Sequence, residues 1–186
     1  MIERYENFLR DFDRILRLLF ELQKEYINCT RGCFLCCDKG DYPFSWQEFS
    51  YLTQGFINLE QHKKIIVQQN IRRLLKEKEE YKGERFVHIC PFLINGECSV
   101  YKYRGILCRT FGIAYYDDTK GYVRLPDCVN FGKNYSKFYD KETKILNIEN
   151  VIKVNLRIDR IFSSELAHSY KLDCGEIRPM LDWLKN

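Results

Sequence analysis

Cysteines are the residues of this 186-residue chain whose spacing is most informative about chemistry. Four of the nine lie close together, at Cys29, Cys33, Cys36 and Cys37. Thiolates are soft ligands that favour zinc, iron–sulfur clusters and copper(I) over hard cations. A short interval such as Cys33 to Cys36 lets two sulfur atoms reach one metal. The spacing therefore predicts a metal site rather than four unrelated buried thiols.

A second group of cysteines is spread through the middle of the chain. We expect it to complete the coordination that the first group begins. Cys174 stands apart from both groups, and an isolated cysteine is more often a small buried apolar residue than a ligand. The predicted metal ligands are Cys29, Cys33, Cys36, Cys37, Cys90, Cys98, Cys108 and Cys128.

The neighbours Cys36 and Cys37 complicate a one-metal interpretation. Adjacent side chains tend to diverge, so we expect one of the two to point to a different metal or away from the site. Zinc would need tetrahedral sites, most simply of four thiolates each. An iron–sulfur cluster also uses cysteine ligands, and a step such as Cys90-Pro91 is common in ferredoxin-type ligation. The residues leave an iron–sulfur cluster, mononuclear iron and zinc open.

Three basic or titratable residues lie beside the second group. Arg104 and Arg109 flank Cys108 and are candidate cofactor-binding residues, because a guanidinium could offset thiolate charge or bind an anion. Ordinary ion pairing is the alternative for both. His88 is a further candidate ligand, since it would share a strand face with Cys90. No spacing typical of hydrolytic catalysis is found, so enzymatic activity is left open.

Composition narrows the class of protein. The 30 basic and 26 acidic residues give a net charge of +4, which is unlike the one-sided charge of a nucleic-acid binder. No stretch approaches the roughly 20 apolar residues of a membrane span. Charges interrupt the first residues, so we expect no signal peptide and a cytoplasmic protein. Thiols stay reduced there, which favours metal binding over disulfides. No protein partner is predicted.

Helices are expected on both sides of the cysteine-rich segment. The first covers residues 2–27, the second runs from Ser45 to about Leu59 with a Ser45–Glu48 capping box, and the third covers 61–81. The apolar face of the first is formed by Tyr5, Phe8, Phe12, Ile15, Leu16, Leu19, Leu22 and Tyr26.

The segment 84–132 is expected to form short strands and metal-binding loops, with turns at Asn95-Gly96 and at 117–121. A later helix face is predicted from Val151, Val154, Ile158, Ile161 and Phe162. A last short helix would be capped by Asp173 and end near Trp183 and Leu184. The prediction is a single domain over 1–186, mainly α with a small irregular β element (α+β), whose helices flank a metal-binding core at about 29–132.

The sequence resembles the YkgJ-type cysteine-cluster family, whose members are described as zinc- or iron-chelating domains with a CxxCxxCC signature. The resemblance extends over about 29–128, and Gly105 stands where the family usually has proline. The matching residues are Cys33, Cys36, Cys37, CPFL from Cys90, CSVY from Cys98, Arg104, CRTF from Cys108, and Cys128.

The resemblance implies eight metal-associated cysteines and a cytosolic protein that chelates zinc, iron or an iron–sulfur cluster. Flagellin lysine N-methylase, a relative of the family, is an iron–sulfur enzyme that uses S-adenosylmethionine. The chain has no glycine-rich nucleotide loop of its own. Two alternatives to simple chelation stay open: an iron–sulfur-dependent modifying enzyme like the methylase, and a metal store or chaperone.

Overall fold

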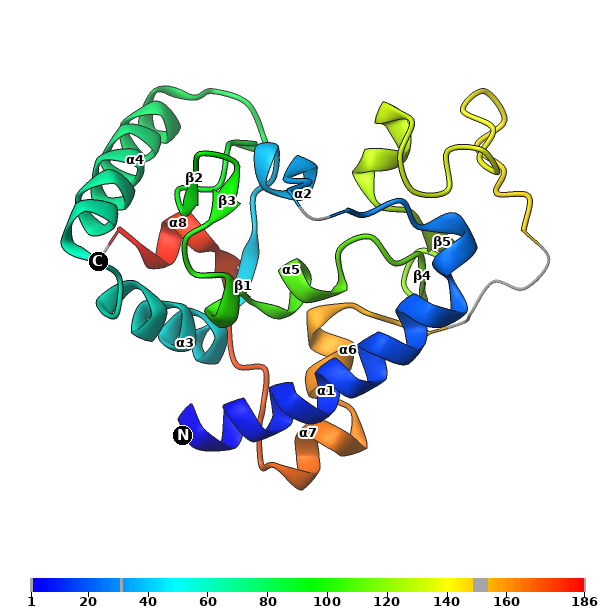
Figure 1. Cartoon of the computed structure of the whole chain (residues 1–186), viewed down its shortest axis with the longest axis horizontal. Coiled ribbons are helices and arrows are strands. Elements are labelled where there is room, and N and C mark those ends of the chain that lie inside the picture. Colours follow the sequence, from blue (N-terminus) through cyan, green and yellow to red (C-terminus); the bar gives the residue numbers. More distant parts are fainter. Residues whose placement is uncertain (1, 31, 149–153, 186) are drawn as a thin grey trace. The chain divides into compact units, whose positions relative to one another are not determined.

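The computed structural model describes residues 2–30, 32–148 and 154–185 (Figure 1). About 49% of the structure is helical and 11% is strand, which confirms the prediction of a mainly α fold with a small β element. Within these residues the strands form three two-stranded antiparallel sheets. None of the helices described is both long enough and apolar enough to cross a bilayer.

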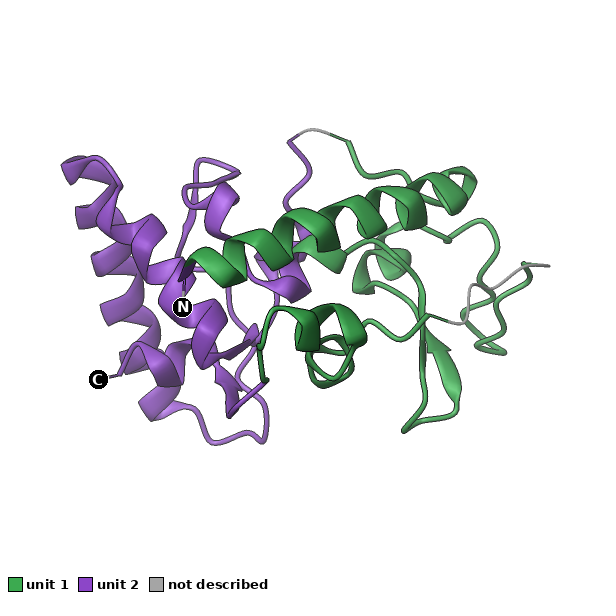
Figure 2. Ribbon diagram, turned by 90° about the horizontal axis from the view of Figure 1, so that it is seen from below, with its two compact units in different colours: residues 1, 3–31, 109–173 green, residues 2, 32–108, 174–186 purple. Residues whose placement is uncertain are grey.

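The chain divides into two compact units, which Figure 2 distinguishes by colour. Apart from the first two residues, unit 1 comprises 3–31 and 109–173, and unit 2 comprises 32–108 and 174–186. Each unit thus combines segments that are distant in the sequence. The single-domain organisation stays a prediction.

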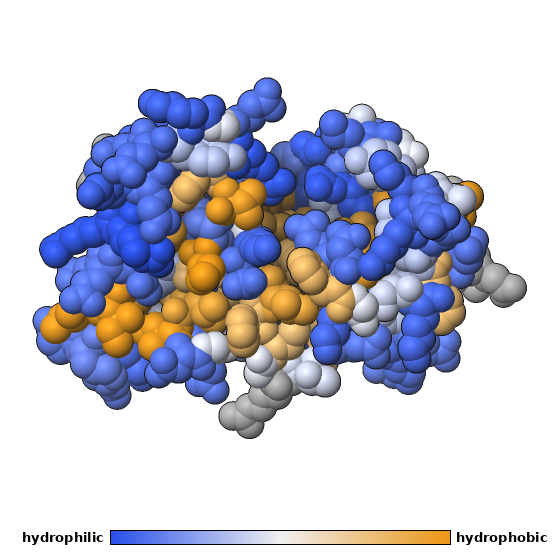
Figure 3. Space-filling view, turned by 90° about the horizontal axis from the view of Figure 1, so that it is seen from above, coloured by the Kyte–Doolittle hydropathy of each residue, from blue (hydrophilic) through white to orange (hydrophobic). Residues whose placement is uncertain are grey.

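The first helix of unit 1 is α1 (Ile2–Leu22), and a 3-10 turn, η1 (Lys24–Tyr26), follows it. Tyr5, Phe8 and Phe12 of α1 are buried, and Phe8 stacks on Phe162 with ring centroids 6.1 Å apart. The predicted burial of Ile15 and Leu22 is wrong, since they are 44% and 68% exposed. Both lie at the margin of the apolar stripe, which is only about 100° wide. Figure 3 shows that other apolar residues are exposed at the surface as well.

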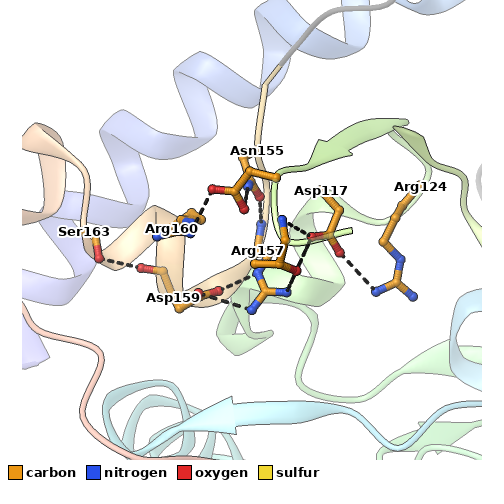
Figure 4. A network of polar contacts seen from close by, with 9 residues as sticks. Asp117, Arg124, Asn155, Arg157, Asp159, Arg160 and Ser163 are labelled. Atoms are coloured by element: carbon orange, nitrogen blue, oxygen red, sulfur yellow. Dashed lines mark hydrogen bonds and ion pairs between the residues drawn. The ribbon is translucent and has the colours of Figure 1, made fainter. Parts of the chain in front are cut away.

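The predicted turn at 117–121 is confirmed as a hairpin of β4 (Tyr115–Asp117) and β5 (Tyr122–Arg124). The fully buried Asp117 carboxylate accepts hydrogen bonds from the Thr119 backbone N–H at 3.0 Å and hydroxyl at 2.6 Å. Its oxygens also lie 3.8 Å from Arg124 and 3.6 Å from Arg157 (Figure 4). This network attaches the segment around Arg157 to the hairpin.

Unit 1 also contains η3 (Asp127–Phe131), α6 (Ile158–Phe162) and α7 (Glu165–Ser169). The predicted helix face that included Val154 is too long, because α6 begins only at Ile158. The Val154 carbonyl instead accepts a hydrogen bond from the Tyr116 N–H of β4 at 2.9 Å. Val151, the first residue of that predicted face, lies outside the described residues.

Unit 2 contains the two other predicted helices, α3 (Trp46–Ile57) and α4 (Gln61–Glu80). Ser45 caps α3 through the predicted capping box: the Glu48 N–H donates to Ser45 Oγ at 3.3 Å, and the Ser45 N–H donates to Glu48 Oε2 at 2.9 Å. Local sequence signals therefore define this helix start correctly.

Short elements follow α4 in unit 2. Asn95 and Gly96 join β2 (Leu93–Ile94) to β3 (Glu97–Cys98), with φ values of 52° and 79° that a two-residue type I′ turn requires. A 3-10 turn, η2 (Tyr101–Tyr103), leads to α5 (Ile106–Thr110), whose residues up to Cys108 belong to unit 2. The Asn95-Gly96 prediction is confirmed.

The end of the chain adds a strand and a short helix to unit 2. β6 (Ile177–Pro179) pairs with β1 (Pro43–Ser45), and α8 (Met180–Trp183) follows. The prediction that Asp173 caps the last helix is wrong, because pairing with β1 keeps 177–179 extended. The buried core of this unit consists of Tyr42, Phe44, Leu52, Val67, Phe92, Val100 and Met180.

Candidate metal centre

Five of the eight predicted cysteine ligands gather beside the core of unit 2. They come from α2 (Leu35–Asp38), the loop before β2, strand β3 and helix α5. All are free thiols that are partly buried. We call them the cysteine cluster: Cys36, Cys37, Cys90, Cys98 and Cys108.

Backbone hydrogen bonds link three of the segments that supply the cysteine cluster. The Cys90 N–H donates to the Cys37 carbonyl at 2.8 Å, and the Leu93 N–H donates to the Cys90 carbonyl at 3.0 Å. Leu93 in turn is paired with Cys98 across the β2–β3 hairpin. The sequence separation between the first and second cysteine groups is therefore closed by main-chain contacts, which fix the sulfur-bearing residues near one another.

The two adjacent cysteines do not diverge as expected. The Sγ atoms of Cys36 and Cys37 lie 3.9 Å apart, within hydrogen-bonding distance for sulfur. They occupy a helix of only four residues, whose ends do not hold the side chains in a regular helical array. The expected divergence of the two side chains is therefore not found. That one of the two points to a different metal or away from the site stays a prediction.

A buried carboxylate positions Cys108. Glu48 Oε1 accepts the N–H of Ile106, the first residue of α5, at 2.7 Å. The same side chain completes the capping box of α3. Gly105 passes so close that a Cβ there would lie 2.7 Å from the Phe44 ring and 2.9 Å from Glu48 Oε1. This close approach gives a reason for glycine at the place where proline was expected from the family resemblance.

Burial makes the thiols of the cysteine cluster harder to ionise. It raises the pKa of Cys90 well above its usual range, raises that of Cys108 to about 12, and also raises the pKa of Cys98. A hydrogen bond with Cys37 lowers the pKa of Cys36 to about 7, while the same bond and burial raise the pKa of Cys37. The metal-free cluster is therefore expected to hold little negative charge, concentrated on Cys36.

Arg104 and Tyr42 border the cysteine cluster. The positive charge of Arg104 lowers the pKa of Cys36 and partly offsets the burial that raises the pKa of Cys98. Its guanidinium lies 3.9 Å from the centre of the Tyr101 ring and donates to the Tyr101 carbonyl at 2.8 Å. Tyr42 is buried, its backbone is left-handed (φ 41°), and the nearby Cys90 and Cys37 thiols add to the burial that raises its pKa.

The other predicted ligands lie elsewhere in the two units. Cys33 is exposed in unit 2. Cys29 and Cys128 belong to unit 1, where Asn134 Nδ2 donates to Cys29 Sγ at 3.1 Å and Cys128 is buried in η3. Their metal-binding role stays a prediction. Cys174, which was not expected to bind metal, is partly buried in unit 2.

Arg109 and His88 have other contacts than cysteine. The Arg109 guanidinium is 7% exposed and pairs with Asp13 at 2.6 Å within unit 1, so ion pairing accounts for its charge. The His88 Nδ1 atom lies 2.8 Å from the Ile89 carbonyl, which requires Nδ1 to donate. The His88 ring stacks on Phe86 with centroids 5.5 Å apart.

Glu48 and Tyr42 are the residues of the site that the sequence interpretation missed. The capping-box spacing identified Glu48 as a helix-start residue, but its second bond, to Ile106, is a contact across 58 positions.

In the part of the chain that the structure describes, no group of three or more His, Cys, Asp or Glu side chains is arranged so that it could hold a metal ion. Comparisons with protein-family models, curated proteins and solved structures gave no match to this chain.

Proposed function

We propose that this chain binds a thiophilic metal, as an iron–sulfur cluster or iron, through the cysteine cluster of unit 2. Zinc is the alternative that the same thiols would accept. The observation that supports the proposal most is the packing of Cys90, Cys98 and Cys108 against one buried core. A main-chain hydrogen bond from Cys90 to Cys37 and the 3.9 Å contact of Cys37 with Cys36 bring the other two thiols to the same group. Unpaired cysteines are common in cores one at a time, but five gathered at one place exceed what packing requires.

The donor set fits such a group chemically. Thiolates are the ligands that iron–sulfur clusters and structural zinc sites use, and the bound metal would supply the positive charge that keeps several thiolates ionised together. Deprotonation on binding would overcome the burial that raises the pKa of Cys90 and Cys108. Arg104 would offset the negative charge that a thiolate-rich site retains.

The free cluster would have to tighten around its metal. Four thiolates suffice for one tetrahedral metal or one cubane cluster, so one of the five would remain outside the first coordination sphere. Cys36 and Cys37, 3.9 Å apart, are the pair from which that extra thiol would come. Because side chains would be drawn together, metal binding is expected to stabilise unit 2 against unfolding.

Two further expectations belong to the same proposal. The cytoplasm is the compartment in which the nine cysteines would stay reduced. Arg104 is the residue that we assign to the bound group, whereas the Asp13 contact of Arg109 favours a structural role for that side chain.

The test is the metal content of the full chain after anaerobic purification. Iron, zinc and acid-labile sulfide are measured in the wild type, in Cys90→Ser and Cys108→Ser, and in the matched control Cys174→Ser. We expect metal at a constant ratio to protein in the wild type and in the control, and a large loss in the other two variants. Wild-type protein without metal, which also fails to take up iron or zinc under reducing conditions, would overturn the proposal.

A further inference from the structure

A cavity of about 240 Å³ lies in unit 2, and no cysteine is among its lining residues. Four segments surround it: the chain at Asp41 before β1, the end of α4, the loop from Glu84 to His88, and the chain around α8. The volume is below the roughly 300–1,000 Å³ of sites for drug-sized ligands. The cavity therefore suits a molecule of amino-acid size and is too small for a nucleotide cosubstrate.

The apolar side of the cavity is built from rings and an aliphatic side chain. Phe86 and His88 stack with an interplanar angle of 26°, and Leu181 beside them is fully buried. Because His88 Nδ1 is directed to the Ile89 carbonyl, Nε2 is the ring nitrogen left to meet a ligand.

The polar side of the cavity carries both signs of charge as two ion pairs. Lys78 Nζ lies 2.6 Å from Asp182 Oδ1, and Arg85 pairs with Asp41 through two bonds of 2.9 and 3.2 Å. Glu84 adds a third carboxylate. A simple anion would meet three carboxylates here, and a simple cation would meet two positive groups. A ligand with one charge of each sign can satisfy both kinds of wall.

The two ion pairs are easily exchanged for a ligand. The Arg85 side chain is 64% exposed and those of Lys78 and Asp182 are 24% and 36% exposed. Ion pairs with this much solvent contact contribute little to stability. A bound zwitterion would replace them with equivalent charge-assisted hydrogen bonds while covering the Phe86–His88 rings.

We propose that this cavity binds a small zwitterion of the α-amino acid type. The ligand carboxylate is held by Lys78 and Arg85, and the ligand ammonium is held by Asp41, Glu84 and Asp182. The ligand side chain packs on the rings of Phe86 and His88. This proposal does not rest on the metal proposal, since no residue of the cysteine cluster lines the cavity.

The first test is calorimetric titration of the full chain with the proteinogenic L-amino acids. We expect saturable binding of at least one of them. The primary amide and the N-acetyl derivative of that amino acid should each bind at least about tenfold more weakly, because each lacks one charge-assisted contact. Absence of saturable binding by every amino acid, or equal binding of either derivative, would overturn the proposal.

The second test locates the site. Lys78→Gln should weaken binding of the same amino acid at least about tenfold, whereas Lys76→Gln, on an exposed part of α4, should leave it unchanged. A second measurement, NMR of the imidazole signals, uses only the wild-type protein and so does not depend on the stability of any variant. Binding should shift the signals of His88 and leave those of His62 and His168 in place; shifts at either of the latter without one at His88 would refute this location.

Discussion

Replacing Glu48 by glutamine tests the role that the structure gives to this buried carboxylate. Its two oxygens accept the N–H groups of Ser45 at 2.9 Å and Ile106 at 2.7 Å. A glutamine oxygen can keep only one of these bonds, and the amide NH2 then faces the other donor. An unsatisfied buried donor costs about 1–3 kcal/mol, so we expect the free energy of unfolding to fall by about 2 kcal/mol.

Urea unfolding followed by tryptophan fluorescence measures this loss of stability in unit 2, to which Glu48 belongs. Trp46 and Trp183 are the two tryptophans of the chain, and both belong to unit 2. In a chain of this length about 2 kcal/mol corresponds to a melting temperature lower by about 4–8 °C. The control Glu79→Gln, on an exposed part of α4, should remain within about 0.5 kcal/mol of the wild type.

A second variant separates the helix cap from the positioning of Cys108. Ser45→Ala removes only the bond from the Glu48 N–H to Ser45 Oγ, at a cost of about 1 kcal/mol, and leaves the Ile106 contact intact. Metal affinity should therefore fall in Glu48→Gln and be preserved in Ser45→Ala. Wild-type stability in Glu48→Gln, or the same metal affinity in both variants, would refute the reasoning.

Three further predictions follow from the packing and charges. Gly105→Ala should destabilise unit 2 by about 1–3 kcal/mol in the same urea assay, because its Cβ would lie 2.7 Å from the Phe44 ring; Gly121→Ala, at φ +73° with open space, should cost only about 1 kcal/mol. Hydrogen bonds from Thr119 lower the pKa of Asp117 in the folded chain. The ionised carboxylate therefore stabilises the fold at pH values above its unfolded pKa of about 3.9. That stability is lost as the pH falls through the lower pKa of the folded chain. On acidification below about pH 4, Asp117→Asn should accordingly lose less stability than the wild type. The measurement is urea unfolding at several pH values, and parallel plots of unfolding free energy against pH for the two proteins would contradict this. Arg109→Met should lower the melting temperature while leaving the metal content unchanged, because the Asp13 pair is structural; a loss of metal with an unchanged melting temperature would instead support a cofactor contact.

Local signals in the sequence were sufficient for the elements that local contacts determine. The Ser45–Glu48 spacing, the helix expected at 61–81 and the Asn95-Gly96 pair each depend on residues close in the sequence, and the structure agrees with all three. The segment after Asp173 was misassigned because its conformation depends on a distant partner. Ile177 pairs with Ser45, a contact that no local pattern encodes.

The candidate site was predictable in composition but not in arrangement. The cysteine pattern selected eight thiols, which include the five that the structure gathers in unit 2 but also Cys29, Cys33 and Cys128. The assignment of Cys29 and Cys128 to unit 1 depends on tertiary contacts, such as the one from Asn134 to Cys29. The hydrogen bond from the Ile106 N–H to Glu48 joins residues 58 positions apart, which only the folded chain brings together.

X-ray absorption at the bound metal tests the central claim most directly. The spectrum of the metal-loaded full chain reports which atoms surround the metal and at what distance. If the cysteine cluster binds the metal, the first shell should consist of about four sulfur atoms, at about 2.3 Å in the case of zinc. Cys90→Ser and Cys108→Ser should lose this shell or replace sulfur by a lighter atom. A first shell of nitrogen and oxygen alone in the wild type would contradict the account.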